Sequence, residues 1–520
     1  MTYRFFFVAL LLMIAACGNG GQHDNELQIP LPRVIISDYT QTLYDIPAPP
    51  PEEFIPPEPD IPSFNEYTVF LDFEPETRII RGIKSVRYTN RTNTNLNELV
   101  FIVPLNAWSG GHPAPYSTDS YNRIFRHGRD YGFMDVLHVT QDSEGLNYSL
   151  DGTILTIGLP RVLGPYETAQ IHIQFEASIP MIAHRTGANE HAIWAGAFLP
   201  VEAIFDRQGW HRPVYYPTGN PFILDVANYT VEITTPIDYI VAGTGVKTET
   251  YLDERKITSF TAQMTRDFAF AISPYFNRTS VMTDSGAVEI VLYHYTANLP
   301  TDHILNVASE TFAFFEETVG VYPYTQLSIV ETDMFLGGEN FSGIIFMDSD
   351  YLRTYPGLSN LRRKIGRQWF SIIIGSNPIE ESWLNGGMTY FLQYGLLDRP
   401  SELRAFIERE HNNLSAGPAS DYYNEDHQRI ASRLNQYDLW IDYVRIQHQK
   451  AGIMFYALYR EMGPENFKFL LREYFRQFAF HIATASDFIA LAEEIHGSSL
   501  RSFFDYWLYT TELPDLPNTR

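Results

Sequence analysis

The spacing of apolar residues changes once along the chain, and this change constrains the fold more than any other feature. From Tyr67 to about Phe276, apolar and polar residues alternate in short runs with a period of two, and turn clusters such as Asp151-Gly152 separate the runs. This alternation predicts an antiparallel β domain with one buried face. Farther along, the apolar spacing becomes helical. We therefore expect a multidomain α+β protein.

The second half of the chain predicts a mixed α/β lobe that leads into a helical lobe. We expect strands at 288–294, 326–331 and 344–347, with one helix between the first two strands. We expect further helices at about 358–375, 383–397, 465–478 and 487–496. Ser486 is the expected N-cap of the last of these, and Gly497 is its expected stop. The expected units are a β-sandwich domain at 63–280, an α/β lobe at 281–400 and a helical lobe at 401–520.

The first 17 residues, MTYRFFFVALLLMIAAC, resemble a bacterial lipoprotein signal peptide. Their apolar stretch is too short to span a membrane as a stable helix, and two alanines precede Cys17. Cys17 is the only cysteine of the chain, which favours lipidation over the alternative, an ordinary signal peptide with an incidental cysteine. We therefore expect a palmitate-type lipid anchor on a membrane of the bacterial cell envelope. Gly18 after the cysteine favours the outer membrane.

Residues 18–62 are rich in proline and predict an extended tether between this anchor and the folded part. A proline-rich ligand for a partner domain is the alternative. The whole chain carries a formal net charge of −25. A body this acidic repels phosphates, so we expect no nucleic-acid partner.

Several phrases, in a matching order, resemble the membrane alanyl aminopeptidase family, which are gluzincin zinc aminopeptidases. They are YTVFLDFEPETRIIRGIKSVRYTN, LNELVFIVPLNAW, Arg266-Asp267-Phe268 and DFIALAEEIHGSSLRSFFDYWL. The resemblance covers about residues 65–515. It implies a saddle-like β domain, a thermolysin-like catalytic lobe and a helical lobe that closes a cleft. It also implies zinc as the cofactor of the family.

The zinc motif of that family is matched in its frame but not in its ligands. The family carries H-E-x-x-H-Q-W and then W-L-N-E-G, in which two histidines and the later glutamate bind zinc and the first glutamate is the general base. The matching text here is RKIGRQW (363–369) and WLNGG (383–387), with the family spacing kept. Arg363, Arg367 and Gly386 thus stand at the ligand positions, and Lys364 stands at the base.

These replacements remove the chemistry that holds the metal. An arginine stays protonated and offers no lone pair, and a glycine has no side chain to offer. The resemblance also aligns His448 with the catalytic tyrosine of the family. We therefore expect no zinc and no peptidase catalysis, so that the chain is a pseudoenzyme on a metallopeptidase fold.

The substrate-amine glutamate of the family follows its Gly-Gly-Met, and the text here is Gly337-Gly338-Glu339-Asn340. Counting back from Gly343 places Asn340 at that position. A gap of one residue would place Glu339 there instead, and both alignments stay open.

Arg363, Lys364 and Arg367 share one face of the helix predicted at 358–375. The resemblance turns this face toward the cleft, where the cations need partners such as Glu339, Glu380 or Glu381. The first hypothesis is a binding protein that holds a peptide, an acidic ligand or a partner on residues 337–340 and these cations. The alternatives are an active metallo-aminopeptidase or other hydrolase with an unrecognised site, and a purely structural envelope scaffold.

Overall fold

The computed structural model describes residues 64–110, 118–216, 218–335, 337–416, 428–437, 439–514 and 516. These residues belong to one compact unit, Pro51–Arg520. The predicted signal peptide with Cys17 and the whole predicted tether (18–62) lie outside the described residues. None of the described helices is both long enough and apolar enough to cross a membrane.

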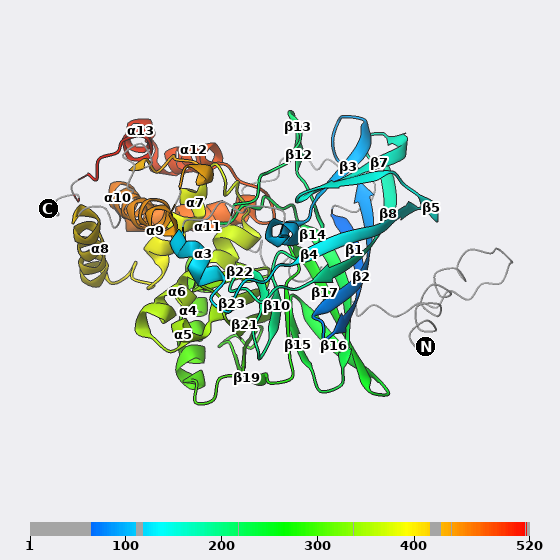
Figure 1. Cartoon of the computed structure of the whole chain (residues 1–520). Coiled ribbons are helices and arrows are strands. Elements are labelled where there is room, and N and C mark those ends of the chain that lie inside the picture. The colour runs from blue at the N-terminus through cyan, green and yellow to red at the C-terminus, as the bar shows by residue number, and fades with distance from the viewer. Residues whose placement is uncertain are drawn as a thin grey trace. The chain divides into compact units, whose positions relative to one another are not determined.

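An eight-stranded sheet dominates the first half of this unit (Figure 1, blue to green). In sheet order its strands are β16 (Val246–Leu252), β17 (Arg255–Thr265), β14 (Ala227–Pro236), β1 (Asn65–Glu74), β2 (Ile79–Thr89), β8 (Thr168–Ser178), β4 (Phe133–Gln141) and β5 (Glu144–Gly145). Buried and accessible residues alternate along β1, as the period of two predicts. Neighbouring strands run antiparallel except β1 and β14, which are parallel, with Tyr67 opposite Tyr229.

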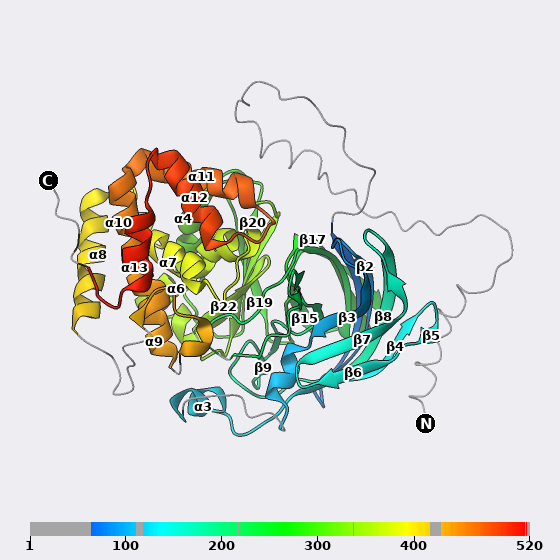
Figure 2. The same ribbon diagram turned by 90° about the horizontal axis from the view of Figure 1, so that it is seen from above.

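Smaller sheets complete the β-rich part, and the larger sheet curves strongly beside them (Figure 2). One contains β15 (Ile240–Gly243), β18 (Phe270–Ser273), β10 (Ile193–Ala195) and β9 (Thr186–Ala188). Another contains β11 (Val201–Glu202), β3 (Leu96–Ile102), β7 (Ile154–Leu163) and β6 (Tyr148–Asp151), and β12 (Phe205–Asp206) pairs with β13 (Gly209–Trp210). Buried residues of the three larger sheets, such as Phe175, Phe101 and Phe270, share one apolar core.

A five-stranded mixed sheet opens the second half. Its order is β19 (Asn277–Met282), β20 (Glu289–His294), β21 (Gln326–Thr332), β23 (Ile344–Asp348) and β22 (Gly338–Phe341). The parallel step from β20 to β21 passes through α4 (Thr301–Thr318), whose buried face includes Leu305, Ala308, Phe312 and Phe315. The three strands and the helix expected from the sequence in this region are confirmed.

Helices form most of the remaining chain (Figure 1, yellow to red). They are α5 (Ser349–Leu352), α6 (Tyr355–Arg367), α7 (Ser382–Leu392), α8 (Pro400–Ser415), α9 (Trp440–Val444), α10 (Ala451–Met462), α11 (Pro464–Phe478), α12 (Ala485–His496) and α13 (Arg501–Tyr509). Shorter elements are α3 (Thr118–Ile124), the 3₁₀ turns η1 (Pro104–Trp108) and η4 (Leu434–Gln436), and the π-helical turns η2 (Gln368–Ile373) and η5 (Arg445–Lys450). The predicted α+β class, β-rich first and helical afterwards, is confirmed.

Three local predictions need correction. The helix expected over 383–397 ends at Leu392. The helix expected over 358–375 is regular only to Arg367, and it continues as the π-helical turn η2. The expected N-cap Ser486 lies inside α12, because Thr484 caps that helix. The Thr484 hydroxyl accepts from the Asp487 N–H, and the Asp487 carboxylate accepts from the Thr484 N–H. Gly497 ends α12 in a left-handed conformation, as expected.

Arg266, which follows β17, ties the β-rich part to the helix that carries the cationic residues. Its guanidinium is buried and donates to the carbonyls of Ile372 in η2, at 2.7 Å, and of His481, at 2.8 Å. Gly375 leaves room for this group, because a Cβ there would lie 2.4 Å from the Arg266 Cζ atom. These bonds hold the end of the α6–η2 helix in place.

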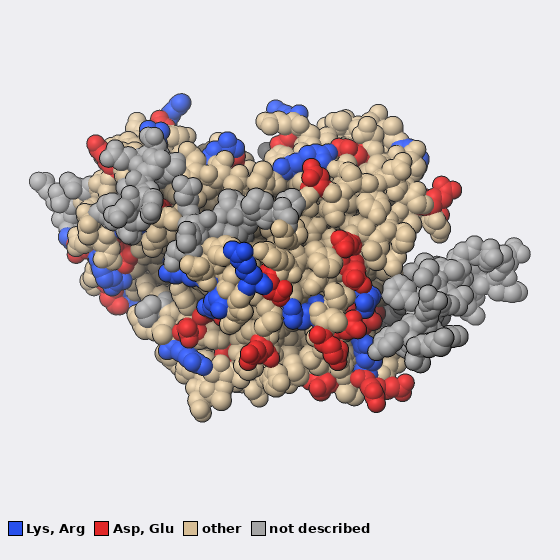
Figure 3. All heavy atoms as spheres, in the orientation of Figure 1, with Lys and Arg blue, Asp and Glu red and all other residues tan. Residues whose placement is uncertain are grey.

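The surface carries mixed charge. On the face shown in Figure 3, acidic and basic side chains lie interspersed. The described part of that face shows no extended basic area. The cationic residues considered next belong to α6.

Candidate functional site

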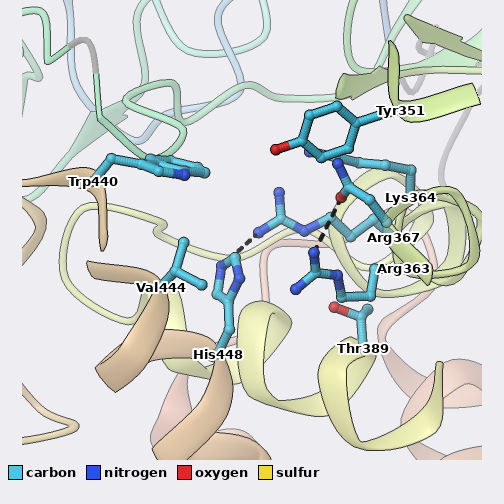
Figure 4. Close-up of a pocket in the computed structure, with 9 residues that line it drawn as sticks. Tyr351, Arg363, Lys364, Arg367, Thr389, Trp440, Val444 and His448 are labelled. Atoms are coloured by element: carbon cyan, nitrogen blue, oxygen red, sulfur yellow. Dashed lines mark hydrogen bonds between the residues drawn. The ribbon is translucent and has the colours of Figure 1, made fainter. Parts of the chain in front are cut away.

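A cavity of about 170 Å³ brings together the cationic residues of α6 and a histidine of η5. Arg363, Lys364, Arg367 and His448 line it (Figure 4). The lining is completed by Tyr351, Asn360, Thr389, Trp440 and Val444. Residues 363 and 367 are four apart on one helix, so their side chains project from the same face. The cavity thus collects two arginines, a lysine and a histidine, and no carboxylate is among the described residues that line it.

Both guanidinium groups extend from α6 into this cavity (Figure 4). The Arg367 Nη2 atom lies 3.4 Å from the His448 Nε2 atom. The Arg363 Nη2 atom donates to the Asn360 Oδ1 atom at 3.3 Å, and its guanidinium lies 5.4 Å above the centre of the Tyr390 ring. A neutral amide and an aromatic face therefore position Arg363 without neutralising it, and an imidazole positions Arg367.

Glu339 of β22 is not one of the lining residues, but its carboxylate contacts two of these cations. Its Oε1 atom lies 3.4 Å from the Lys364 Nζ atom and 3.7 Å from the Arg367 Nη1 atom. Its Oε2 atom lies 3.4 Å from the Arg185 Nη2 atom. Burial raises the pKa of Glu339, but the attraction of Lys364, Arg185 and Arg367 outweighs it, so the pKa lies below its usual value. Glu339 is therefore ionised at neutral pH.

The cluster shifts the proton affinity of its own members. Burial, with the neighbouring Arg367 and Arg363, lowers the pKa of Lys364 to about 7, although Glu339 opposes the shift. Burial first, and then the three cations of α6, lower the pKa of His448 well below 6.5. His448 is thus neutral at pH 7, and its ring nitrogen can accept from Arg367.

Residues 337–340 comprise the first three residues of β22 and the glycine that precedes it. Gly337 has a φ of +76°, and a Cβ there would lie 2.4 Å from the Tyr351 ring, so only glycine fits. Gly338 and Glu339 then pair with β23. The Asn340 Oδ1 atom is buried and makes no hydrogen bond within the described residues. Of the two residues left open by the sequence, Glu339 is the one whose carboxylate contacts the cations.

Gly386 of α7 is packed closely against His448. A Cβ on residue 386 would come 2.5 Å from the His448 Cδ2 atom and 2.8 Å from the Gln447 carbonyl oxygen. Distances this short are not tolerated in packed proteins, so α7 or η5 would have to move to admit a side chain. The imidazole and backbone of η5 therefore occupy the space that a glutamate at position 386 would need.

The donor chemistry of this cluster does not fit zinc. Zinc takes imidazole nitrogen, thiolate sulfur or carboxylate oxygen as ligands, and guanidinium groups have no free lone pair. His448 offers one nitrogen, and Glu339 offers a carboxylate that three cations already contact. Among the described residues, no group of three or more His, Cys, Asp or Glu is placed to hold a metal ion.

Several contributors to the site were not expected from the sequence. Arg185 precedes β9 in the β-rich part, far along the chain from Glu339, and no local motif marks it. Two expected partners lie elsewhere, because Glu380 pairs with Arg433 and Glu381 accepts from the backbone N–H of Ala485 at 2.9 Å. The aromatic lining residues also carry no signal in the sequence, because short helices far apart in the chain supply them.

Comparison with known proteins confirms the family resemblance. Residues 303–507 match the model of the peptidase family M1 domain. Human glutamyl aminopeptidase is 22% identical over 299 residues, which cover 54% of this chain and 31% of that protein. Tricorn protease-interacting factor F2 of Thermoplasma acidophilum is 19% identical over 278 residues, which cover 51% of this chain and 35% of that protein. The match therefore spans about a third of the length of these relatives.

Solved structures show the same fold. The M1 zinc metallopeptidase of Deinococcus radiodurans superposes with a TM-score of 0.67 at 14% sequence identity, covering 88% of this chain and 97% of that one. A mutant of that peptidase bound to a Tyr-Ser-Ala substrate gives a TM-score of 0.64 at 14% identity, covering 88% and 96%. The described architecture is thus that of an M1 aminopeptidase, and identity at this level speaks for the fold alone.

Proposed function

We propose that this chain, which carries a peptidase family M1 domain over residues 303–507, is a non-catalytic member of that fold that binds an acidic ligand through its α6 cations. The reaction expected of this fold needs a metal-bound water and a carboxylate base. The corresponding positions hold Arg363, Arg367 and Gly386 in place of ligands, and Lys364 in place of the base. A fold retained without its catalytic groups remains free to bind.

One observation carries the choice of an acidic ligand. Within the described residues, no carboxylate oxygen lies within 4.0 Å of Arg363, although its guanidinium lines a cavity and is largely removed from water. Burial lowers the pKa of Arg363, as is expected of a cation that has no carboxylate partner among the described residues. An anion entering the cavity would supply the missing partner and would be held by a planar group suited to carboxylates.

A structural scaffold is the second candidate, and one observation favours it. Glu339 already forms internal ion pairs with three cations. This is the arrangement expected of a closed cleft whose charges are paired within the protein. The scaffold accounts for Lys364 and Arg367 but leaves Arg363 unexplained. Binding measurements separate the two candidates, since a scaffold gains nothing from an added anion.

The N-terminal residues support an envelope location. We infer that Cys17 is acylated after cleavage and anchors the chain to the cell envelope, with the outer membrane favoured by Gly18. Mass spectrometry of the membrane-extracted protein checks this. A lipid-modified Cys17 at the mature N-terminus supports the anchor, and an unmodified or retained N-terminus contradicts it.

The binding proposal is tested with purified protein and a short peptide rich in glutamate. We expect saturable binding that weakens at least tenfold in the variant Arg363→Ala/Arg367→Ala. Arg362→Ala is the matched control, because Arg362 lies on the same helix but donates to Thr311 outside the cavity, at 2.8 Å. Unchanged binding in the double variant, or equal loss in the control, contradicts the proposal.

Turnover is tested separately on a panel of aminoacyl fluorogenic substrates. We expect no release above the uncatalysed background. Turnover that a chelator abolishes would overturn the non-catalytic assignment and favour an active metallo-aminopeptidase. Turnover that a chelator leaves intact would favour a hydrolase with another site.

A further inference from the structure

The Tyr390 side chain of α7 contacts both a cation of the cavity and a buried carboxylate of α8. The Arg363 guanidinium lies 5.4 Å above the centre of the Tyr390 ring. The hydroxyl of the same ring donates to the Glu410 Oε2 atom. Glu410 is buried, but it is not one of the described residues that line the cavity, and it forms its ion pair with Arg409. The Tyr390 ring therefore joins Arg363 to a charged group outside the cavity.

Further contacts hold the Tyr390–Glu410 pair in place. The Gln449 Nε2 atom of η5 lies 3.4 Å from the Tyr390 hydroxyl oxygen and 3.4 Å from the Glu410 Oε2 atom. Phe406 is four residues before Glu410 on α8, and the centre of its ring lies 6.0 Å from that of Tyr390. Burial first, and then Glu410, raise the pKa of the Tyr390 phenol, so that it stays protonated and donates at neutral pH. The hydrogen bond and the ring contact together fix the orientation of the Tyr390 ring.

We propose that Glu410 is a positioning residue for the ligand-binding cavity, because it holds the Arg363 guanidinium in place through the Tyr390 phenol. This inference rests on the proposed function and adds to it a residue that lies outside the cavity. Sequence spacing does not indicate the link, since α6, α7 and α8 each supply one of its three members.

The hydrogen bond to Glu410 acts on Arg363 in two ways. It keeps the face of the Tyr390 ring turned toward the guanidinium, which prefers the face of an aromatic ring to its edge. A phenol that donates to a carboxylate is also polarised by it, and the added negative charge over the ring attracts a cation more strongly. Arg363 also donates to the Asn360 Oδ1 atom at 3.3 Å (Figure 4), so the ring and this amide together direct its N–H groups.

Calorimetric titration of the full chain with the glutamate-rich peptide tests this role. Tyr390→Phe removes the hydrogen bond and keeps the ring, and Glu410→Gln removes the charge and keeps the shape. We expect each change to weaken peptide binding by about threefold or more, and the two together to weaken it no further than the stronger of them. A further loss in the combined variant would mean that Glu410 acts without Tyr390, and it would overturn the inference.

Two control variants show whether the loss is specific. Tyr459→Phe removes another tyrosine hydrogen bond of the helical region, the one to the Leu397 carbonyl at 3.0 Å. Glu408→Gln removes a more exposed carboxylate from the same helix, α8. Both should leave the peptide affinity unchanged. A loss in either control as large as that in Glu410→Gln would contradict the link through Tyr390.

A second background separates positioning from a general loss of structure. In the Arg363→Ala protein, Glu410→Gln should not weaken peptide binding further, because the guanidinium that it positions is absent. The same fold-loss with and without Arg363 would show a merely structural role and would overturn the inference while the proposed function stands.

Absence of peptide binding by the parent protein would overturn the proposed function, and thermal denaturation then decides the positioning role. Glu410→Gln should lower the midpoint of the parent more than that of the Arg363→Ala protein, because only the parent has the contact that it supports. Equal shifts of the midpoint in the two backgrounds would overturn the inference as well.

Discussion

The Cδ2 atom of His448 lies 2.5 Å from the place where a Cβ atom on Gly386 would stand. The Gln447 carbonyl oxygen lies 2.8 Å from the same place. α7 and η5 are therefore packed around the absence of a side chain at residue 386. The glutamate that the family resemblance implies at position 386 could not be accommodated without a shift of these two helices.

The first prediction concerns this contact. Gly386→Ala gains about 1 kcal/mol of helix propensity but overpacks the α7–η5 contact at about 1–3 kcal/mol, so we expect a net loss of stability near 1 kcal/mol. Urea denaturation measures it. Gly145→Ala is the control, because a Cβ there meets nothing within 4 Å, and it should not destabilise. A Gly386→Ala protein at least as stable as the parent would contradict the packing described.

The second prediction concerns Glu339. Glu339→Gln leaves Lys364, Arg367 and Arg185 without their shared carboxylate, and breaking a buried ion pair costs about 3–5 kcal/mol. Chemical denaturation should show a loss of this size. Glu380→Gln, which breaks a more exposed pair with Arg433, should cost about 0–1 kcal/mol. Equal effects of the two changes would mean that Glu339 does not hold the cluster together.

The third prediction concerns the pH dependence of anion binding. Lys364 has a pKa of about 7, and Glu339, Arg363 and Arg367 are the charged groups that act on it. A bound anion favours the protonated amine, so binding takes up protons near pH 7. The affinity for the glutamate-rich peptide should therefore fall between about pH 6.5 and pH 8.5, where its carboxylates stay ionised. Lys364→Met should bind more weakly with a flatter profile, and an unchanged slope would contradict the role of Lys364.

Lys364 also makes the stability of the unliganded protein depend on pH. Its folded-state pKa lies below the unfolded value of 10.5, so between about pH 7 and pH 10.5 the unfolded chain binds more protons. The contribution of Lys364 to stability therefore rises with pH over that window, and its burial penalty is fully present below pH 7. Lys364→Met should be more stable than the parent near pH 6 by a larger margin than near pH 10. A stability difference between Lys364→Met and the parent that grows with pH would contradict the lowered pKa of Lys364.

The fourth prediction separates the two candidate caps of α12. Thr484→Ala removes the capping hydroxyl and should cost about 1 kcal/mol. Ser486→Ala changes an exposed residue inside the helix and should be close to neutral. Thermal denaturation of the two variants decides between them. A larger loss for Ser486→Ala would restore the cap expected from the sequence.

Much of the secondary structure could be predicted, because the burial of one face of a strand or helix sets the spacing of its apolar residues. The alternation along β1, the apolar face of α4 and the glycine stop of α12 follow from the period of each element. The π-helical turn η2 could not be predicted, because it depends on distant partners. The Gln368 amide donates to the Phe341 carbonyl and accepts from the Gly343 N–H, and both partners belong to the β22–β23 hairpin.

The same division holds at the site. Arg363, Lys364 and Arg367 could be found because the family resemblance aligns them with the zinc motif, whereas their spacing alone indicates only one shared helix face. Which of Glu339 and Asn340 contacts the cations depends on how β22 packs against α6. Residue spacing in the sequence does not give this packing. Arg185 could not be found at all, because only tertiary packing brings it to Glu339.

The metal content of the purified, tag-free protein tests the central claim most directly. The protein is dialysed against excess zinc, then against zinc-free buffer, and is analysed by mass spectrometry of the elements. We predict no stoichiometric zinc, because guanidinium groups and a glycine stand at the ligand positions. One zinc ion retained per chain and removed by a chelator would contradict the account.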